Sequence, residues 1–211
     1  MLLINRGIYI LFLLRTVAAT AKKNIYAPNT MIITISGVPG SGKSTIGKIL
    51  AKKLGYEYFS MGDLRGQMAM ERGLTIDELN ALGEKEDWTD KRADEIQTQM
   101  GKEKDNFIFE GRLSWYFIPS SFKIFFTVDQ KTAAERTLKN RAERPDEKSV
   151  ATLAEAEEAV RQRLASDKKR YLLHYGIDYT KPENYDLVID TANLKIEEIT
   201  QIILDKIKTK V

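Results

Sequence analysis

A glycine-rich segment near residue 40 carries the residue types that bind phosphate groups. Residues 37–44 read Gly-Val-Pro-Gly-Ser-Gly-Lys-Ser and match the pattern G-x-x-x-x-G-K-[ST] in full. Glycines let such a loop curl until its backbone N–H groups point at phosphate oxygens, and the following helix adds partial positive charge. Lys43 is expected to reach the β and γ phosphates, and Ser44 to offer its hydroxyl to Mg²⁺. The pattern predicts a site for ATP built from Gly37, Val38, Pro39, Gly40, Ser41, Gly42, Lys43, Ser44 and Thr45.

Two short segments further along combine acidic residues with arginine. Residues 62–65 read Gly-Asp-Leu-Arg and residues 110–112 read Glu-Gly-Arg, each shortly after an apolar run. In a parallel sheet, ligands bind beyond the carboxyl ends of the strands. Arg65 and Arg112 are therefore predicted to hold an acceptor phosphate by paired, charge-assisted hydrogen bonds, with Asp63 beside them. Glu110 is the candidate partner of Mg²⁺. The alternative is a solvated arginine and a structural Glu–Arg pair.

Six arginines in the second half of the chain could close over a triphosphate. They lie on or near two predicted helices that are joined by a short polar break. Closure would exclude water and place positive charge on the transferring group. The alternative is a solvated helix face on which arginines pair with nearby glutamates. We expect two to four of the six to contact phosphate; they are Arg136, Arg141, Arg144, Arg161, Arg163 and Arg170.

Hydrophobic patterning predicts the elements that must position these residues. Apolar strands are expected at 31–36, 56–59, 107–109, 122–128 and 187–189. Helices are expected at about 43–54, 63–72, 75–86, 88–104, 131–144, 152–175 and 196–207. Strands that are apolar throughout and alternate with helices favour an α/β fold, whose parallel sheet is covered by helices on both faces. His174, the single histidine, is expected to have a structural role.

The composition narrows the classes of function. The chain has 211 residues and a net charge of +3. It contains no cysteine, which excludes disulfides and thiolate metal sites. Residues 1–30 contain four basic and no acidic residues, so the rest of the chain sums to −1. We therefore expect no nucleic-acid partner and no membrane span, and a cytoplasmic protein. We expect residues 1–30 to be a poorly ordered tail or the result of an upstream start site, a targeting signal being the alternative.

Taken together, seven segments carry a resemblance to a known family. They are residues 37–45, 62–65, 110–113, 134–136, 167–171, 175–178 and 185–191. In combination they resemble the archaeal-type cytidylate kinases, which are nucleoside monophosphate kinases with a P-loop. The resemblance implies a doubly wound five-stranded parallel sheet within a kinase domain at 31–211. It also implies a helical acceptor-binding insertion at about 62–105 and a short lid at about 141–150.

The resemblance also implies roles for single residues. Arg136 would pack against the adenine of ATP, while Arg163, Asp167 and Arg170 would serve the acceptor and the transferred phosphoryl group. Arg141 would bind the triphosphate, although its spacing from Arg136 leaves Lys139 as an alternative. The implied catalytic set is Lys43, Arg112, Arg136, Arg163 and Asp167.

The resulting hypothesis is transfer of the γ-phosphoryl group of ATP, bound with Mg²⁺, to CMP or dCMP. Asp94 and Gln97 are plausible hydrogen-bonding groups for the base, and Trp115 is a possible stacking surface. We expect a monomer whose partners are small nucleotides. Two alternatives remain: another small-molecule P-loop kinase, of the adenylate or dephospho-coenzyme A type, and an ATP-dependent assembly module.

Overall fold

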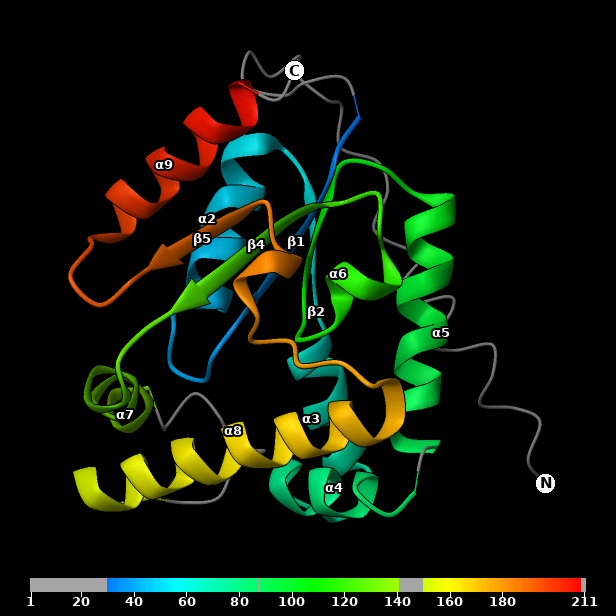
Figure 1. Cartoon of the computed structure of the whole chain (residues 1–211), viewed down its shortest axis with the longest axis vertical. Helices are drawn as coiled ribbons and strands as arrows, with labels where there is room; N and C mark the ends of the chain where they lie inside the picture. Colours follow the sequence, from blue (N-terminus) through cyan, green and yellow to red (C-terminus); the bar gives the residue numbers. More distant parts are fainter. Residues whose placement is uncertain (1–29, 87, 141–149, 210–211) are drawn as a thin grey trace.

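The fold is a single parallel sheet between helices, seen in a computed structural model that describes residues 30–86, 88–140 and 150–209 (Figure 1). The strand order is β2-β3-β1-β4-β5, and every neighbouring pair is parallel. The strands are β1 (Ile32–Gly37), β2 (Glu57–Ser60), β3 (Phe107–Glu110), β4 (Phe122–Thr127) and β5 (Leu187–Asp190). The predicted doubly wound five-stranded sheet is therefore confirmed.

The central strand is buried along its whole length. All six residues of β1 are buried, because β3 and β4 pair with its two edges and helices cover its two faces. Alternate residues point to opposite faces, so Ile33 and Ile35 join one apolar cluster while Ile32 joins another. This explains why the strand sequence is almost continuously apolar.

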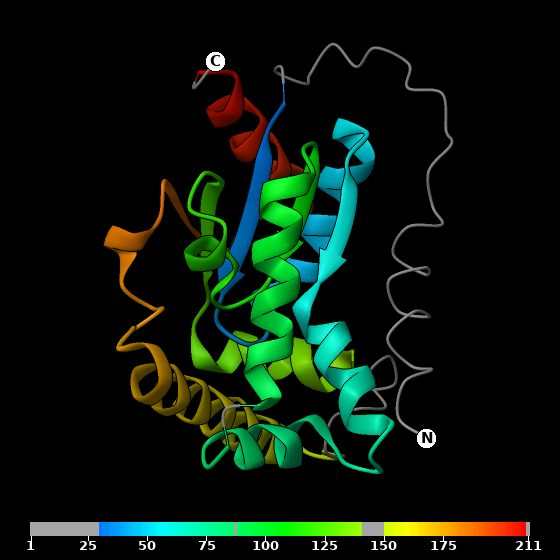
Figure 2. The same ribbon diagram turned by 90° about the vertical axis from the view of Figure 1, so that its right-hand side faces the viewer.

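Two helices cover one face of the sheet and two cover the other. The helices α2 (Lys43–Leu54) and α9 (Ile196–Lys208) pack together, and their apolar residues share one cluster with β1 and β4. On the opposite face lie α5 (Trp88–Glu103) and the short α6 (Ser114–Phe117), as Figure 2 shows for α5. The sheet is thereby shielded on both faces, and the carboxyl edge of the strands is left for ligands.

The remaining helices gather at that carboxyl edge (Figure 1). Helix α3 (Met61–Met70) directly follows β2, and α4 (Ile76–Gly83) packs against it. Across from them, α7 (Gln130–Lys139) packs against the long α8 (Leu153–Tyr175), which also contacts α4. Local signals fix several of these ends. Thr75 and Glu78 form the capping box that starts α4, and Gly176 ends α8 at a φ of 69°.

The observed elements differ from the sequence-based expectations at a few boundaries. The helix expected from 131 to 144 is wrong at its end, because α7 stops at Lys139 and Asn140 leaves helical geometry at its C-cap. Helix α6 and the 3₁₀ turn Pro182–Asn184 were not predicted, since such short elements have no periodicity to detect. The expected extension and the lid fall mainly on residues 1–29 and 141–149, which lie outside the described residues.

Candidate functional site

The glycine-rich loop joins β1 to α2, as the pattern predicts. Gly40 has a φ of +72°, and a Cβ atom there would lie 2.5 Å from the carbonyl oxygen of Ala133. A residue other than glycine would therefore be strained and would also clash with α7. Gly42 has a φ of 84° and stands immediately before the first turn of α2. The loop thus brings the N-terminal N–H groups of α2 to the carboxyl edge of β1, which is the geometry of an anion site.

Lys43 lies in this loop and is almost fully buried. Its Nζ donates to the carbonyl oxygen of Val38 at 2.8 Å and approaches Ser41 Oγ at 3.5 Å. Burial lowers the pKa of Lys43 well below its ordinary value, and the neighbouring Arg112 lowers it further, while Glu110 opposes this. The amino group is thus held inside the loop, where a bound anion would stabilise its charged form.

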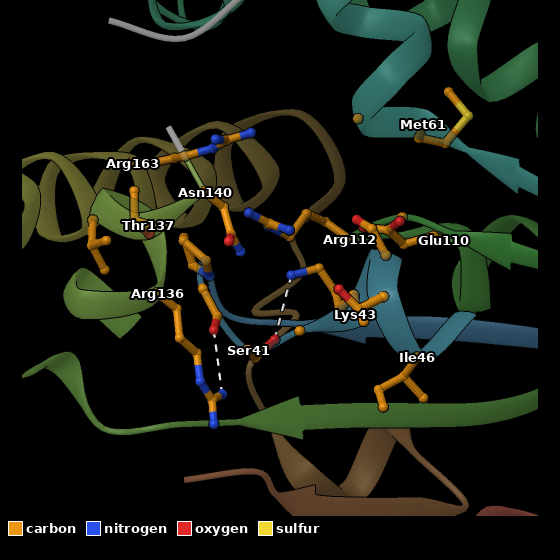
Figure 3. Close-up of a pocket in the computed structure, with 18 of the residues that line it drawn as sticks. Ser41, Lys43, Ile46, Met61, Glu110, Arg112, Arg136, Thr137, Asn140 and Arg163 are labelled. Carbon is orange, nitrogen blue, oxygen red and sulfur yellow. Dashed lines mark hydrogen bonds between the residues drawn. The ribbon is translucent and has the colours of Figure 1, made fainter. Parts of the chain in front are cut away.

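A cavity of about 980 Å³ opens over this loop and runs along the carboxyl edge of the sheet. Eight basic and four acidic side chains line it, so its walls are positively charged although the chain body is not. Lys43, Arg112 and Arg163 extend into the same space from three different elements (Figure 3). The basic residues are Lys43, Lys48, Arg65, Arg112, Arg136, Lys139, Arg163 and Arg170.

The two residues proposed for Mg²⁺ both line the cavity. Ser44 lies in the first turn of α2, and Glu110 ends the strand β3. Glu110 is 6% exposed and accepts a hydrogen bond from the hydroxyl of Tyr58. No group of three or more His, Cys, Asp or Glu suited to a metal exists among the described residues. One hydroxyl and one carboxylate suit Mg²⁺, which keeps most of its water and binds largely through phosphate oxygens.

Arg112 and Asp167 form a buried ion pair across the cavity. Arg112 Nε lies 2.8 Å from Asp167 Oδ2, and Arg170 approaches the other carboxylate oxygen at 3.1 Å. Burial by itself would raise the pKa of Asp167, but Arg112, Arg170 and Arg163 outweigh it and keep the pKa below its ordinary value. The carboxylate therefore stays ionised and orients Arg112, which follows β3, and Arg170, which lies in α8.

A second buried network joins the acceptor-side arginines. Arg65 and Arg170 are 7% and 1% exposed, and both donate to Oδ1 of Asn80, at 3.0 Å and 2.7 Å. Arg65 also donates to the carbonyl oxygen of Thr89 at 2.9 Å. Through Asn80 and Asp167, the structure thus brings Arg65, Arg112 and Arg170 together. Sequence reasoning missed Asn80, because an asparagine in a polar helix has no distinguishing local signal.

Arg136 and Arg163 complete the wall near the phosphate loop. The guanidinium of Arg136 donates to the carbonyl oxygen of Thr191 at 2.7 Å and reaches Gly40 O at 3.5 Å (Figure 3). It therefore ties the loop to the segment after β5 while still lining the cavity. Arg163 lines the cavity from α8. Asp63 also lines it, from the first turn of α3.

Several residues singled out from the sequence lie elsewhere. Neither Asp94 nor Gln97 lines the cavity; Asp94 accepts from the hydroxyl of Tyr175, and Gln97 accepts from Ser114 Oγ at 2.7 Å. Trp115 packs edge-on against Tyr116 and Tyr185. Arg161 forms an exposed ion pair with Glu158.

The remaining sequence-based expectations concern His174, the lid residues and a membrane span. His174 has the expected structural contact, because its Nε2 lies 2.7 Å from the carbonyl oxygen of Gly83. Arg141 and Arg144 lie outside the described residues. Lys139, the alternative to Arg141, does line the cavity. In the described part of the chain, no helix is long and apolar enough to cross a membrane.

The chain is similar in sequence to several known proteins. The model of the cytidylate kinase-like family matches residues 32–193. A cytidylate kinase of Methanobrevibacter smithii is 34% identical over 178 residues, which cover 84% of this chain and 99% of that protein. A cytidylate kinase of Archaeoglobus fulgidus is 33% identical over 181 residues, covering 85% and 96%.

A solved structure supports the fold independently. The shikimate kinase of Bacteroides thetaiotaomicron superimposes with a TM-score of 0.57 at 15% identity, covering 85% of this chain and 99% of that one. At that identity the likeness concerns the fold alone.

Proposed function

Because the chain belongs to the cytidylate kinase-like family, we propose that it transfers the γ-phosphoryl group of ATP to CMP or dCMP, giving ADP and CDP or dCDP. One observation carries this proposal beyond the family. The phosphate loop and a separate set of buried arginines line the same cavity, so two phosphorylated ligands can meet there. A protein that only hydrolysed ATP would have no need of the second set, which argues against an assembly module.

The phosphate loop would hold the donor nucleotide. Its N–H groups and the N-terminus of α2 offer hydrogen bonds to the phosphates, while Lys43 would leave Val38 O and follow the γ-phosphoryl group. Ser44 and Glu110 are the residues that would hold Mg²⁺, which neutralises phosphate charge when it is bound. Thr45 follows within the same first turn of α2.

The arginines would hold the acceptor. Arg65 and Arg112 follow the neighbouring strands β2 and β3, so they are placed to grip one phosphate opposite the loop. Arg163 and Arg170 add charge from α8, and Asp167 keeps Arg112 and Arg170 oriented. The attacking atom would be a phosphate oxygen that is already deprotonated at neutral pH. Positioning and charge neutralisation therefore suffice, and no general base is required.

The base would be read away from these phosphate contacts. Asp94, Gln97 and Trp115 remain our candidates for this role, although they do not line the cavity in the present conformation. They would reach the base only if the insertion rearranges when the acceptor binds. We further propose a cytoplasmic monomer that binds no nucleic acid, in line with the absence of cysteine and the near-neutral chain body.

An acceptor panel tests the proposal. ADP release is measured with ATP, Mg²⁺ and each of CMP, dCMP, UMP, AMP, GMP, shikimate and dephospho-coenzyme A. We expect CMP or dCMP to give the highest kcat/KM. If AMP, UMP or a non-nucleotide clearly outperforms them, the cytidylate assignment fails and another small-molecule kinase is identified. ADP release that is independent of every acceptor would instead favour an ATP-dependent assembly module.

A further inference from the structure

Asn80 stands at the point where two of the acceptor-side arginines, Arg65 and Arg170, meet. It lies in α4, is 4% exposed, and lines the cavity. Its Oδ1 accepts from Arg65 at 3.0 Å and from Arg170 at 2.7 Å, residues that come from α3 and α8. A guanidinium group can only donate, so both contacts identify the accepting atom as the amide oxygen. The orientation of the carboxamide is therefore fixed from two sides.

That orientation leaves the amide nitrogen for something else. Nδ2 of Asn80 carries two N–H donors, and it donates to none of the residues that the structure describes. It is also not among the polar atoms that are both sealed from solvent and without a partner, so solvent reaches it, and the side chain that carries it lines the cavity. A donor held rigidly beside two arginines favours an anion that has oxygen atoms to spare.

We propose that Asn80 is a third binding residue for the acceptor phosphate: Oδ1 fixes Arg65 and Arg170, while Nδ2 donates directly to a phosphate oxygen. The inference rests on the proposed function and deepens it. One short side chain would then couple α4 to the phosphate and to the two arginines at once. Placement of the phosphate would depend on α4 as well as on the strands β2 and β3.

The isosteric change Asn80→Asp separates direct contact from mere support. An aspartate can still accept from Arg65 and Arg170, with added charge, but it replaces the donor by an anionic oxygen facing the phosphate. We expect the KM for CMP to rise by about 30-fold or more, since a lost charge-assisted bond is joined by repulsion, with the KM for ATP changed by less than about 2-fold. Asn80→Ala, which loses both functions but adds no charge, should raise the KM for CMP by about 10-fold.

The matched control is Asn106→Asp. Asn106 precedes β3 at the opposite end of the sheet, where its Oδ1 accepts from the backbone N–H of Met31 at 3.3 Å. The same isosteric change there should leave both KM values as in the wild type. Thermal melting of each variant checks that the fold is intact, and Asn80→Ala serves in place of Asn80→Asp if the latter does not fold.

Calorimetric binding of CMP and of cytidine is measured on the same variants. We expect Asn80→Asp to weaken CMP binding and to leave cytidine binding unchanged, because the nucleoside has no phosphate. A folded Asn80→Asp protein with the wild-type KM and affinity for CMP would overturn the inference, as would equal weakening of CMP and cytidine. Failure of the proposed function looks different, because the wild type itself would then transfer no phosphoryl group to CMP.

Discussion

At the scale of single residues, Lys43 shows how the phosphate loop accommodates a buried basic group. Its Nζ donates to Val38 O, but that carbonyl also accepts from the backbone N–H of Ser41 at 3.3 Å and from Ser41 Oγ at 2.8 Å. The carbonyl would therefore stay satisfied without the lysine. The lysine, in contrast, has its pKa lowered by burial, with Arg112 as a nearby like charge. Lys43 therefore lowers the free energy of unfolding of the protein when no nucleotide is bound.

Replacing this lysine should stabilise the protein measured without nucleotide and should abolish most of its phosphoryl transfer. We expect Lys43→Met to raise the Tm of the nucleotide-free protein by at least about 2 °C and to lower phosphoryl transfer by about 10³-fold or more. Differential scanning calorimetry and a coupled ADP assay measure the two effects. Near-normal activity in the folded variant would contradict the role of the loop, and a lower Tm would contradict the expected stabilisation.

The lowered pKa of Lys43 predicts that the free energy of unfolding depends on pH. Its pKa in the folded protein lies below that of the unfolded chain, about 10.4. Between these two values the unfolded chain binds more protons, so the contribution of Lys43 to the free energy of unfolding rises as pH increases. Urea unfolding at several pH values should show this rise in the wild type and a smaller one in Lys43→Met. Equal slopes in both proteins would show that the lysine is not perturbed.

Arg112 allows the acceptor site to be tested apart from the choice of base. We expect Arg112→Ala to lower kcat/KM by about 10- to 200-fold for every monophosphate, without reordering their preference. Asp167 keeps its contact with Arg170 at 3.1 Å in this variant, so the fold should survive. Kinetics on CMP, dCMP and UMP measure the effect. A changed order of preference at an unchanged overall rate would mean that Arg112 reads the base.

Residues differ in how far the sequence alone could place them. Gly37 to Ser44 were predictable because the whole loop is contiguous and its chemistry is local. Arg65 and Arg112 followed from strand ends, which a parallel sheet brings to one edge. Asn80 could not be predicted, since its partners are 15 and 90 residues away and only the packing of α4 on α3 and α8 joins them.

At the scale of elements, α4 is fastened to α8 beyond the buried network. Glu84, just after α4, accepts from Lys169 at 2.6 Å and from Ser166 at 2.7 Å. His174 Nε2 meets Gly83 O one further turn along α8. Hydrogen bonds from Lys169 and Ser166 lower the pKa of Glu84, so it is charged at neutral pH. These contacts hold α4 against α8, the helix that carries Arg163 and Asp167.

Weakening this attachment should affect the acceptor more than the donor. We expect Glu84→Gln to raise the KM for CMP by about 2- to 5-fold, because an exposed ion pair contributes little, and to leave the KM for ATP unchanged. The matched control is Glu57→Gln, which removes the exposed pair with Lys104 at the other end of the sheet. Steady-state kinetics on both variants measure this. Equal effects on the two substrates would argue that the attachment is not specific to the acceptor.

At the scale of the whole molecule, charge is distributed unevenly. The chain after residue 30 is close to neutral, yet eight of its basic side chains line one cavity against four acidic ones. Those basic residues are spread over the sequence from Lys43 to Arg170, so the packing of several elements is needed to bring them to one cavity. None of the site residues proposed from the sequence precedes Gly37.

A protein that starts at Met31 should therefore behave as the full chain does. We expect its kcat/KM for CMP to stay within about 2-fold and its Tm within about 2 °C, because every site residue proposed from the sequence follows residue 36. Both chains are purified and compared side by side by kinetics and calorimetry. A large loss of activity or stability in the shorter chain would show that residues 1–30 belong to the folded domain.

The position of β1 and β2 in the sheet has a consequence for hydrogen exchange. The phosphate loop follows β1, which is paired on both sides and wholly buried. Arg65, in contrast, follows β2, a four-residue strand at the edge of the sheet. Amides of edge strands open through local fluctuations, while those of central strands exchange mainly by global unfolding. We therefore expect the amides of β2, α3 and α4 to exchange through local fluctuations while those of β1 stay protected. Binding of CMP should slow amide exchange in α3 and α4 far more than binding of ATP slows it in β1.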